Sequence, residues 1–208
     1  MILSKICNLN KNCIFKRKSG LNLTEEEQLI MQIKTEPSKF GVLFDAYYAL
    51  IFRFIFNRTS NFEVSREIAS ETFMKAFLNF YSFKWKGISV SYWLYRIANN
   101  EIGQYFRKNK YTPSSIEFLI ESKGWDIEDP KNTIENKAEL ESEVEKHQNY
   151  KRIQEKMKLL ALPYQEVLGL RYFEKKNLKE IAIILEKPEG TIKSLHSRAI
   201  AQLKNMLS

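Results

Sequence analysis

The spacing of apolar residues predicts a chain built from α-helices. In residues 92–110, Leu94, Ala98 and Ile102 recur four positions apart, which is close to the period of one helix face. Comparable stripes run through residues 24–36, 63–81, 151–173 and 178–203. The chain has only 7 Gly and 5 Pro among its 208 residues, which disfavours a turn-rich β architecture.

Two helices near the N-terminus have recognisable boundaries or composition. Thr24, followed by three glutamates, is typical of a helix start with a capping residue, and Pro37 ends that helix. Residues 40–57 are apolar nearly all round and predict a buried helix. Asp45 and Arg53 are their only charges, and these charges argue against a membrane span.

The C-terminal pattern predicts two helices joined by a sharp turn. Residues 178–185 have one apolar side, and residues 186–190 interrupt the helix with a Pro and a Gly. Thr191 is suited to cap a second helix, whose other face is polar and cationic. That face carries Thr191, Lys193, Ser194, Ser197 and Arg198. Such a pair is typical of a helix-turn-helix DNA reader, and the alternative is an ordinary helical hairpin with a solvated face.

The pattern breaks between residues 111 and 150. Pro, Gly, Ser and Asp mark the start of this segment, and its later part is charged with little apolar face. We therefore predict an all-α fold of two small helical domains joined by an acidic linker. The expected divisions are a basic flexible tail at 1–23, a domain at 24–110, the linker at 111–150, and a domain with the helix-turn-helix at 151–208.

The net charge of +8 and the pI near 9.3 indicate an anionic partner, either nucleic acid or a membrane surface. No apolar run reaches the length of a membrane span, and the first residues lack the core of a signal peptide, so a cytoplasmic protein is expected. Cys7 and Cys13 lack the second ligand pair of a zinc site. We expect free thiols and no metal.

Residues 82–110 contain candidate contacts for single-stranded nucleic acid. Lys84, Trp85 and Lys86 combine an aromatic ring with cations, which suits base stacking and phosphate pairing. The alternative, equally favoured, is that the rings of this segment pack into the helical core. In the helix that follows, the polar side carries Arg96, Asn99, Asn100 and Gln104, together with Arg107 and Lys108. Such side chains bond to base edges and phosphates.

Four stretches carry a resemblance to a known family. They are LFDAYYALIFRFI, EVSREIASETFMKAF, YWLYRIANNEIGQYFRK, and the run from LLALPYQEVLGLRYFE through PEGTIKS to RAIAQL. In their order and spacing, the chain resembles a bacterial RNA polymerase sigma factor of the two-domain, extracytoplasmic-function type. The resemblance covers Glu26 to Leu207.

This resemblance implies roles for particular residues. It places Glu67 and Glu71 on the surface that docks on core RNA polymerase. The −10 element would be read and melted by Lys84, Trp85, Lys86, Trp93, Arg96, Asn99, Asn100 and Gln104. The −35 element would be bound by Pro188, Glu189, Gly190, Thr191, Lys193, Ser194, Ser197 and Arg198. The implied partners are core polymerase and promoter DNA, and an anti-sigma factor is a further candidate.

The sequence departs from the family pattern at several positions. Glu186 stands where members commonly have Gly, and because a left-handed backbone is costlier for Glu, we expect a differently shaped turn. Leu195 and His196 replace a frequent Arg-Leu pair. We expect Leu195 to pack into the core, and His196 either to face DNA or the domain edge or to be buried and neutral.

We therefore expect a non-catalytic promoter-specificity subunit without a cofactor. The sequence has no P-loop, no Cys/His pair at catalytic spacing and no metal cluster, which disfavours an enzyme acting on nucleic acid. A stand-alone helix-turn-helix transcriptional regulator is the alternative function.

Overall fold

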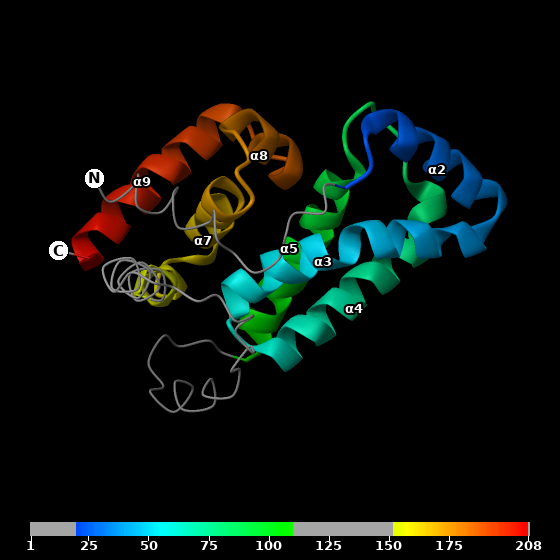
Figure 1. Ribbon diagram of the computed structural model, residues 1–208. Helices are drawn as coiled ribbons and strands as arrows, with labels where there is room; N and C mark the ends of the chain where they lie inside the picture. Colours follow the sequence, from blue (N-terminus) through cyan, green and yellow to red (C-terminus); the bar gives the residue numbers. More distant parts are fainter. Residues whose placement is uncertain (1–19, 110–151, 208) are drawn as a thin grey trace, which may run out of the picture.

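The computed structural model describes residues 20–109 and 152–207 (Figure 1). Within these ranges the chain is helical and contains no strand, so the all-α prediction is confirmed there. The expected basic tail, apart from residues 20–23, and the whole of the expected acidic linker lie outside the described residues. The same holds for Cys7 and Cys13.

The first helix, α2, covers Leu23–Thr35 and begins one residue before the predicted cap. Asn22, not Thr24, is the N-cap residue. Its side chain accepts a hydrogen bond from the Glu25 backbone, while the Glu25 carboxylate accepts one from the Asn22 backbone. This capping box satisfies two otherwise unpaired N–H groups. The helix ends at Thr35, and Pro37 starts a short 3₁₀ turn, η2 (Pro37–Lys39).

The central helix, α3 (Phe40–Thr59), packs against both following helices, α4 (Phe62–Leu78) and α5 (Val90–Lys108). The expectation that no apolar run reaches the length of a membrane span is wrong, because Pro37–Thr59 is long and apolar enough by length and composition alone. Half of its most apolar window is buried inside the protein. Leu43, Ile51 and Phe54 of its inner side are fully buried. The helix is less buried than predicted, because Phe44 and Phe56 lie on an exposed side.

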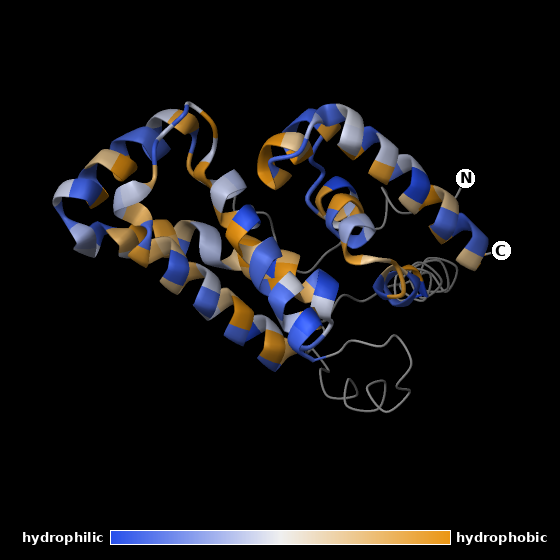
Figure 2. Cartoon of the chain, turned by 180° about the vertical axis from the view of Figure 1, so that it is seen from behind, coloured by the Kyte–Doolittle hydropathy of each residue, from blue (hydrophilic) through white to orange (hydrophobic). Residues whose placement is uncertain are grey.

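The connection between α4 and α5 positions the segment that the sequence assigned to single-stranded nucleic acid. After α4, a short 3₁₀ turn, η3 (Phe80–Ser82), reverses the chain. An irregular segment then leads to Ser89, whose side chain caps the start of α5. In Figure 2, hydrophobic and hydrophilic segments alternate along the helices, as expected for helices with one buried side.

The C-terminal helices surround a second hydrophobic cluster. The chain is helical over 152–158, and α7 (Leu162–Leu168), with Pro163 in its first turn, continues into a π-helical turn, η5 (Gly169–Phe173). The helices α8 (Leu178–Leu185) and α9 (Glu189–Leu207) follow. The cluster consists of Ile153, Met157, Leu160, Leu168, Phe173, Ala199 and Leu203.

The two groups of helices share one core. The large buried cluster of α2–α5 also contains Val167, Leu170, Ile181, Ile184 and Ile192 from the C-terminal half. Figure 1 shows α8 next to α5, and the two helices are in contact. We call this contact region between α7–α9 and α2–α5 the seam. At the seam, a Cβ on Gly169 would lie 3.5 Å from Cδ of Arg58, an ordinary van der Waals distance, so Gly169 packs directly against the Arg58 side chain.

Candidate nucleic-acid interface

The helix-turn-helix predicted at the C-terminus is formed by α8 and α9. Asn177 and Glu180 close a capping box at the start of α8. At its end, Glu186 adopts the left-handed conformation with φ 51° and ψ 43°. The expectation of a differently shaped turn is therefore wrong. Glu186 keeps the backbone that glycine favours, and the Lys187 N–H donates to the Ala182 carbonyl at 3.1 Å.

The predicted −35 residues lie at the start and along one side of α9. Thr191, Lys193, Ser194, Ser197 and Arg198 are all exposed. Helix α9 begins at Glu189, two residues before the predicted start, so Thr191 lies in the first turn instead of capping it. Lys193 contacts Glu189 at 2.8 Å, and its hydrogen bond lowers the pKa of that carboxyl. Arg198 donates to the Ser194 backbone at 3.3 Å. These local contacts leave the face open to a ligand.

Leu195 and His196 replace the family's common pair without disturbing the helix packing. Leu195 is half-buried against the main core, as predicted. His196 is half-buried and lies 3.1 Å from the Tyr172 hydroxyl, with the two rings stacked. Burial lowers the pKa of His196, and Arg171 lowers it further. These contacts favour the expectation of a neutral histidine packed inside the domain.

The turn conformation can be tested with two substitutions at one position. Glu186→Gly and Glu186→Ala both remove the side chain that pairs with Arg96, but only glycine adopts a positive φ without steric cost. We expect the Gly variant to be about 1 kcal/mol more stable than the Ala variant in urea unfolding. Equal stability of the two variants would mean that residue 186 is not left-handed in solution.

Helices α4 and α5 form a surface hollow of about 480 Å³ that brings together three of the predicted −10 residues. Trp93, Asn100 and Gln104 all line it. The other lining residues are Lys75, Asn79, Ser82, Ile97 and Glu101. The Lys75 ammonium contacts Glu101 at 2.6 Å and Glu71 at 3.4 Å, and the hydrogen bond to Glu101 raises the pKa of Lys75. The hollow thus combines an aromatic wall with amide groups and a paired cation.

The segment before α5 lies next to this hollow but is only partly free. Lys84 and Lys86 are exposed, whereas Trp85 is half-buried against the core. Phe83 packs on Trp93 with ring centroids 4.5 Å apart. Of the two interpretations left open by the sequence, the structure supports a mixture, with partly packed rings beside exposed cations.

Two predicted −10 residues are engaged in contacts inside the protein, Arg96 at the seam and Asn99 within α2–α5. Arg96 donates to the carbonyls of Ile184 at 3.0 Å and Ile183 at 2.8 Å, and it also forms an ion pair with Glu186. Asn99 is only 3% exposed and accepts a hydrogen bond from Arg58. Asn99 therefore does not lie on the exposed polar side of α5, as the sequence predicted. Its position between Tyr95 and Ile102 places it on the buried face.

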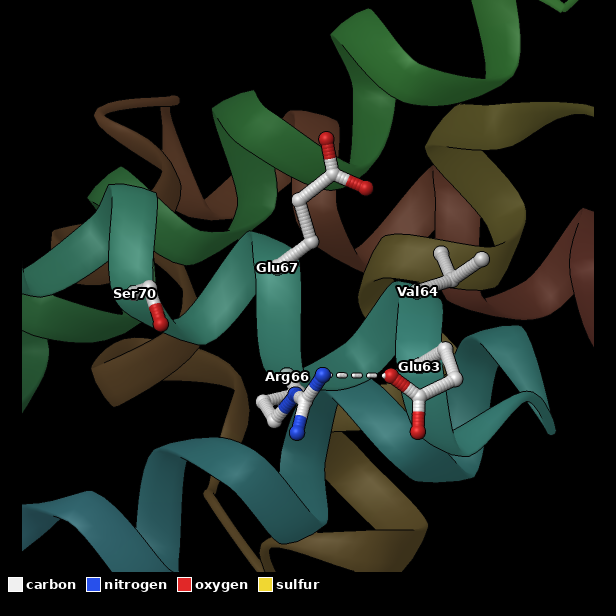
Figure 3. A pocket seen from close by; sticks show the side chains of 5 residues that line it. All are labelled: Glu63, Val64, Arg66, Glu67 and Ser70. Atoms are coloured by element: carbon white, nitrogen blue, oxygen red, sulfur yellow. Dashed lines mark hydrogen bonds and ion pairs between the residues drawn. The ribbon is translucent and has the colours of Figure 1, made fainter.

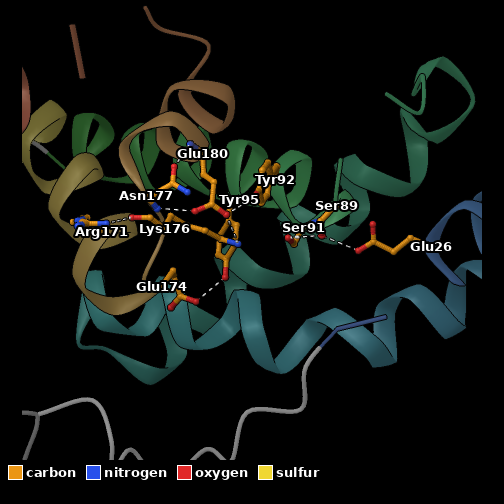
Figure 4. Close-up of polar contacts among 10 residues, drawn as sticks. All are labelled: Glu26, Ser89, Ser91, Tyr92, Tyr95, Arg171, Glu174, Lys176, Asn177 and Glu180. Carbon is orange, nitrogen blue, oxygen red and sulfur yellow. Dashed lines mark hydrogen bonds and ion pairs between the residues drawn. The ribbon is translucent and has the colours of Figure 1, made fainter. Parts of the chain in front are cut away.

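Other polar contacts tie the seam together (Figure 4). The Tyr95 hydroxyl donates to Glu174 at 2.6 Å, and Arg53 pairs with the same carboxylate at 2.9 Å. Tyr92 donates to Glu180 of α8. Burial raises the pKa of both tyrosines, and the neighbouring glutamates raise it further. Both hydroxyls are therefore protonated donors at neutral pH.

The exposed side of α4 carries the acidic residues predicted to bind polymerase. Glu63, Val64, Arg66, Glu67 and Ser70 surround a shallow hollow of about 350 Å³ (Figure 3). Glu63 and Arg66 pair at 2.7 Å, while Glu67 extends away from this pair. Burial raises the pKa of Tyr105 of α5, and the nearby Glu67 charge raises it further. Glu71 is exposed one turn further along.

Comparison with known protein families identifies both halves of the chain. Residues 43–112 match the family model for sigma-70 region 2, and residues 164–205 match the model for sigma-70 region 4. The chain belongs to the sigma-70 family. It is a sigma factor of the extracytoplasmic-function group.

Named relatives agree with this assignment. The chain is 28% identical to the ECF RNA polymerase sigma factor BldN of Streptomyces coelicolor over 172 residues. These residues cover 83% of this chain and 61% of BldN. It is 26% identical over 163 residues to the sigma factor SigM of Bacillus subtilis, and these residues cover 78% of this chain and 91% of SigM. The fold is similar to that of the sigma factor RpoE of Bartonella quintana, with a TM-score of 0.54 and 22% identity over 81% of this chain and 96% of that one.

The family assignment decides between the functions that the sequence left open. Two sigma regions in order do not favour a stand-alone helix-turn-helix regulator. Sigma factors of these families are not catalytic enzymes. Among residues 20–109 and 152–207, no group of three or more His, Cys, Asp or Glu side chains is placed to hold a metal ion.

Glu26 is a structural residue of this sigma factor that its sequence pattern did not single out. Glu26 was grouped with its neighbours as a first-turn acid, yet its side chain is buried and reaches the start of α5. A signal was present, because Glu26 lies four and seven positions before Ile30 and Ile33, on the apolar face of its helix.

Proposed function

We propose that this sigma factor binds core RNA polymerase and the −10 element through α2–α5 and the −35 element through α7–α9. Residues 24–110 and 151–208 are the two domains in this proposal, and residues 111–150 connect them. The domains act by binding and perform no catalysis. Their place of action is the cytoplasm, where polymerase and promoter DNA meet.

The single observation that carries the proposal is the exposed face of α9. Hydroxyl and cationic side chains lie along one side of the second helix of a helix-turn-helix, while Ile192, Ala199 and Leu203 fix the opposite side in the core. A helix presented in this way fits the major groove, where Lys and Arg bond to guanine and hydroxyl groups bond to several bases. Pro188, Glu189 and Gly190 stand at its N-terminal end, where backbone N–H groups can meet a phosphate.

For the −10 element, the proposal assigns the hollow between α4 and α5 to an unstacked base. The Trp93 ring offers a stacking surface, and the amides of Asn100 and Gln104 offer donors and acceptors for a base edge. Stacking contributes about 1–3 kcal/mol per base, which offsets the cost of a few kcal/mol for unstacking it. The exposed cations Lys84 and Lys86 lie on the preceding segment, where they can pair with phosphates.

Core polymerase is expected to bind the exposed side of α4. Glu67 and Glu71 present carboxylates there, and Met74, Phe77 and Leu78 are exposed further along the same helix. Acidic side chains beside exposed apolar ones suit a basic, amphipathic partner helix.

The contacts of Arg96 mean that the seam must open before this side chain meets DNA. Arg96 is held by the last turn of α8, and Asn99 is buried beside Arg58, whose side chain packs against Gly169 at the seam. Within the described residues, Nε and Nη2 of Arg58 and Nδ2 of Asn99 are buried without a hydrogen-bond partner. Each such group costs about 1–3 kcal/mol, which is recovered when water reaches it. We infer that binding to polymerase separates α8 from α5.

An anti-sigma factor is a further proposed partner. The Bartonella relative of similar fold was solved in complex with the anti-sigma factor NepR. The exposed apolar residues of α4 would be available to such a protein as well as to polymerase.

Gel filtration with core polymerase tests this proposed function. The full chain is expected to co-elute with core polymerase, and Glu67→Lys with Glu71→Lys is expected to weaken the complex because the substitutions reverse both charges. Glu27→Lys with Asp45→Lys, two exposed acids on α2 and α3, is the matched control for net charge. A chain that elutes alone, as a dimer that binds duplex DNA, would favour the stand-alone regulator instead.

Asn100→Ala tests the assignment of the hollow. We expect open-complex formation to slow by about tenfold or more, since a bidentate contact of Asn to a base contributes about 1–3 kcal/mol. The free energy of unfolding should change by less than about 0.5 kcal/mol, because Asn100 is exposed. Lys108→Ala, an exposed residue of α5 that does not line the hollow, is the control. Equal slowing by both variants would remove Asn100 from the proposed base contact.

A further inference from the structure

Glu26 is a buried carboxylate that joins three separate parts of the chain. It extends from the first turn of α2 and is 1% exposed. Its Oε1 accepts hydrogen bonds from the Tyr47 hydroxyl of α3 and from the Ser89 hydroxyl at 2.7 Å. Its Oε2 accepts one from the Val90 N–H at 2.8 Å. Figure 4 shows the carboxylate directed at Ser89.

Burying a carboxylate is unfavourable unless donors replace the lost water. Glu26 has three donors, and hydrogen bonds to an ionised acceptor are about twice as strong as neutral ones. The Tyr47 hydroxyl is one of these three donors. Burial raises the pKa of its phenol, and the Glu26 carboxylate raises it further, so the hydroxyl keeps its proton. An apolar residue in this place would need no such donors, so stability alone does not account for a carboxylate here.

The contacts of Glu26 lie where the irregular segment 83–89 enters α5. Ser89 is the N-cap residue, and its hydroxyl accepts a hydrogen bond from the Ser91 N–H at 3.2 Å while donating to Glu26. Val90 provides one of the first N–H groups of α5, which have no partner within the helix. A carboxylate 64 residues away in sequence therefore completes this cap, and its negative charge suits a helix N-terminus.

The middle of the segment is open at Gly87, although Phe83 and Trp85 pack against the core. Gly87 has a φ of +69°, and no atom lies within 4 Å of the position that a Cβ would occupy there. Its first end is fixed by the η3 turn, where the Phe83 N–H donates to the Phe80 carbonyl at 3.0 Å. The second end is fixed at Ser89 and Val90, by Glu26. The carboxylate thus fixes the end at which the segment enters α5.

We propose that Glu26 is a positioning residue for promoter melting, which fixes the entry of segment 83–89 into α5 and so holds Lys84, Trp85 and Lys86 beside the hollow lined by Trp93. Glu26 acts through Ser89 and Val90 and does not itself touch DNA. The inference rests on the proposed −10 function of this hollow and adds a residue from a helix outside it.

Hydrogen–deuterium exchange on the free full-length chain tests the structural half of this proposal. Glu26→Ala is expected to speed exchange at Val90 and across residues 83–90 by about tenfold, because the cap loses its acceptor. Ile30→Ala, a buried substitution in the same helix, is the control for general loss of stability. Should Glu26→Ala fail to fold, Glu26→Gln keeps one acceptor oxygen and is expected to show a smaller increase in the same residues. Exchange in segment 83–90 that matches the Ile30→Ala variant would overturn the proposal.

Open-complex formation with core polymerase tests the functional half. On a duplex promoter, the Glu26 variant should form open complexes about tenfold more slowly than the Ile30→Ala control. On the same promoter with a pre-melted −10 region, the two should be alike, because the melting step is bypassed. Equal loss on both templates would overturn the positioning role alone. A wild-type chain inactive on both templates would overturn the proposed function itself, and this inference with it.

Discussion

The double substitution Lys193→Ala and Arg198→Ala is expected to reduce transcription from a promoter with a −35 element by about a hundredfold or more. Each side chain that reads bases contributes about 1–3 kcal/mol, and effects at separate contacts add. Both residues are exposed on α9, and their recorded partners, Glu189 and Ser194, lie on the same helix. The fold should therefore be unaffected, and the loss should appear in promoter binding measured with the polymerase complex.

Lys204→Ala is the matched control for this loss. Lys204 is an exposed cation near the other end of the same helix. Its removal should weaken binding by a small, sequence-independent amount, because it takes one positive charge from the far end of the helix. If the double variant kept its preference for promoters with a −35 element, the assignment of this α9 face would be wrong.

Glu174→Ala is expected to lower the free energy of unfolding by about 3–5 kcal/mol, which is the usual cost of removing one partner of a buried ion pair. The Glu174 side chain is 1% exposed and the Arg53 side chain 11%, and they meet at 2.9 Å across the seam. The substitution also removes the acceptor of the Tyr95 hydroxyl. Urea unfolding followed by circular dichroism measures the change.

The exposed pair of Glu63 and Arg66 provides the comparison. Its atoms lie 2.7 Å apart, but both side chains are more than half exposed, so Glu63→Ala should cost less than about 1 kcal/mol. A Glu174→Ala variant no less stable than Glu63→Ala would mean that α7–α9 and α2–α5 do not pack together in the free chain.

Much of the fold followed from local pattern. Apolar spacing predicted the helices, and the Pro-Gly interruption placed the turn between α8 and α9. The exposed polar side of α9 was predicted correctly because Ile192, Ala199 and Leu203 fix which side is buried. Helix starts were less accurate. Thr24 and Thr191 both looked like caps, but Asn22 caps α2 and α9 begins at Glu189. Several polar residues near a helix start compete for the same role.

The residues that sequence reasoning placed wrongly depend on distant neighbours. Asn99 belongs to a polar run on α5, and only the approach of Arg58 shows that it is buried. In the sequence Arg96 is one of several cations on α5, yet its side chain donates to carbonyls of α8, almost 90 residues away. Glu186 was expected to alter the turn because of its side chain, but the turn keeps its left-handed backbone. No spacing rule within a single helix contains this information.

In vitro transcription with core polymerase, followed by sequencing of the transcript starts, is the direct test of promoter recognition by this sigma factor. The full chain is expected to direct core polymerase to defined start sites that share −35 and −10 sequences. Lys193→Ala with Arg198→Ala, and separately Asn100→Ala, should depress initiation at those sites. If no start site depended on the chain, or if the starts shared no upstream sequence, the chain would not recognise promoters in this way.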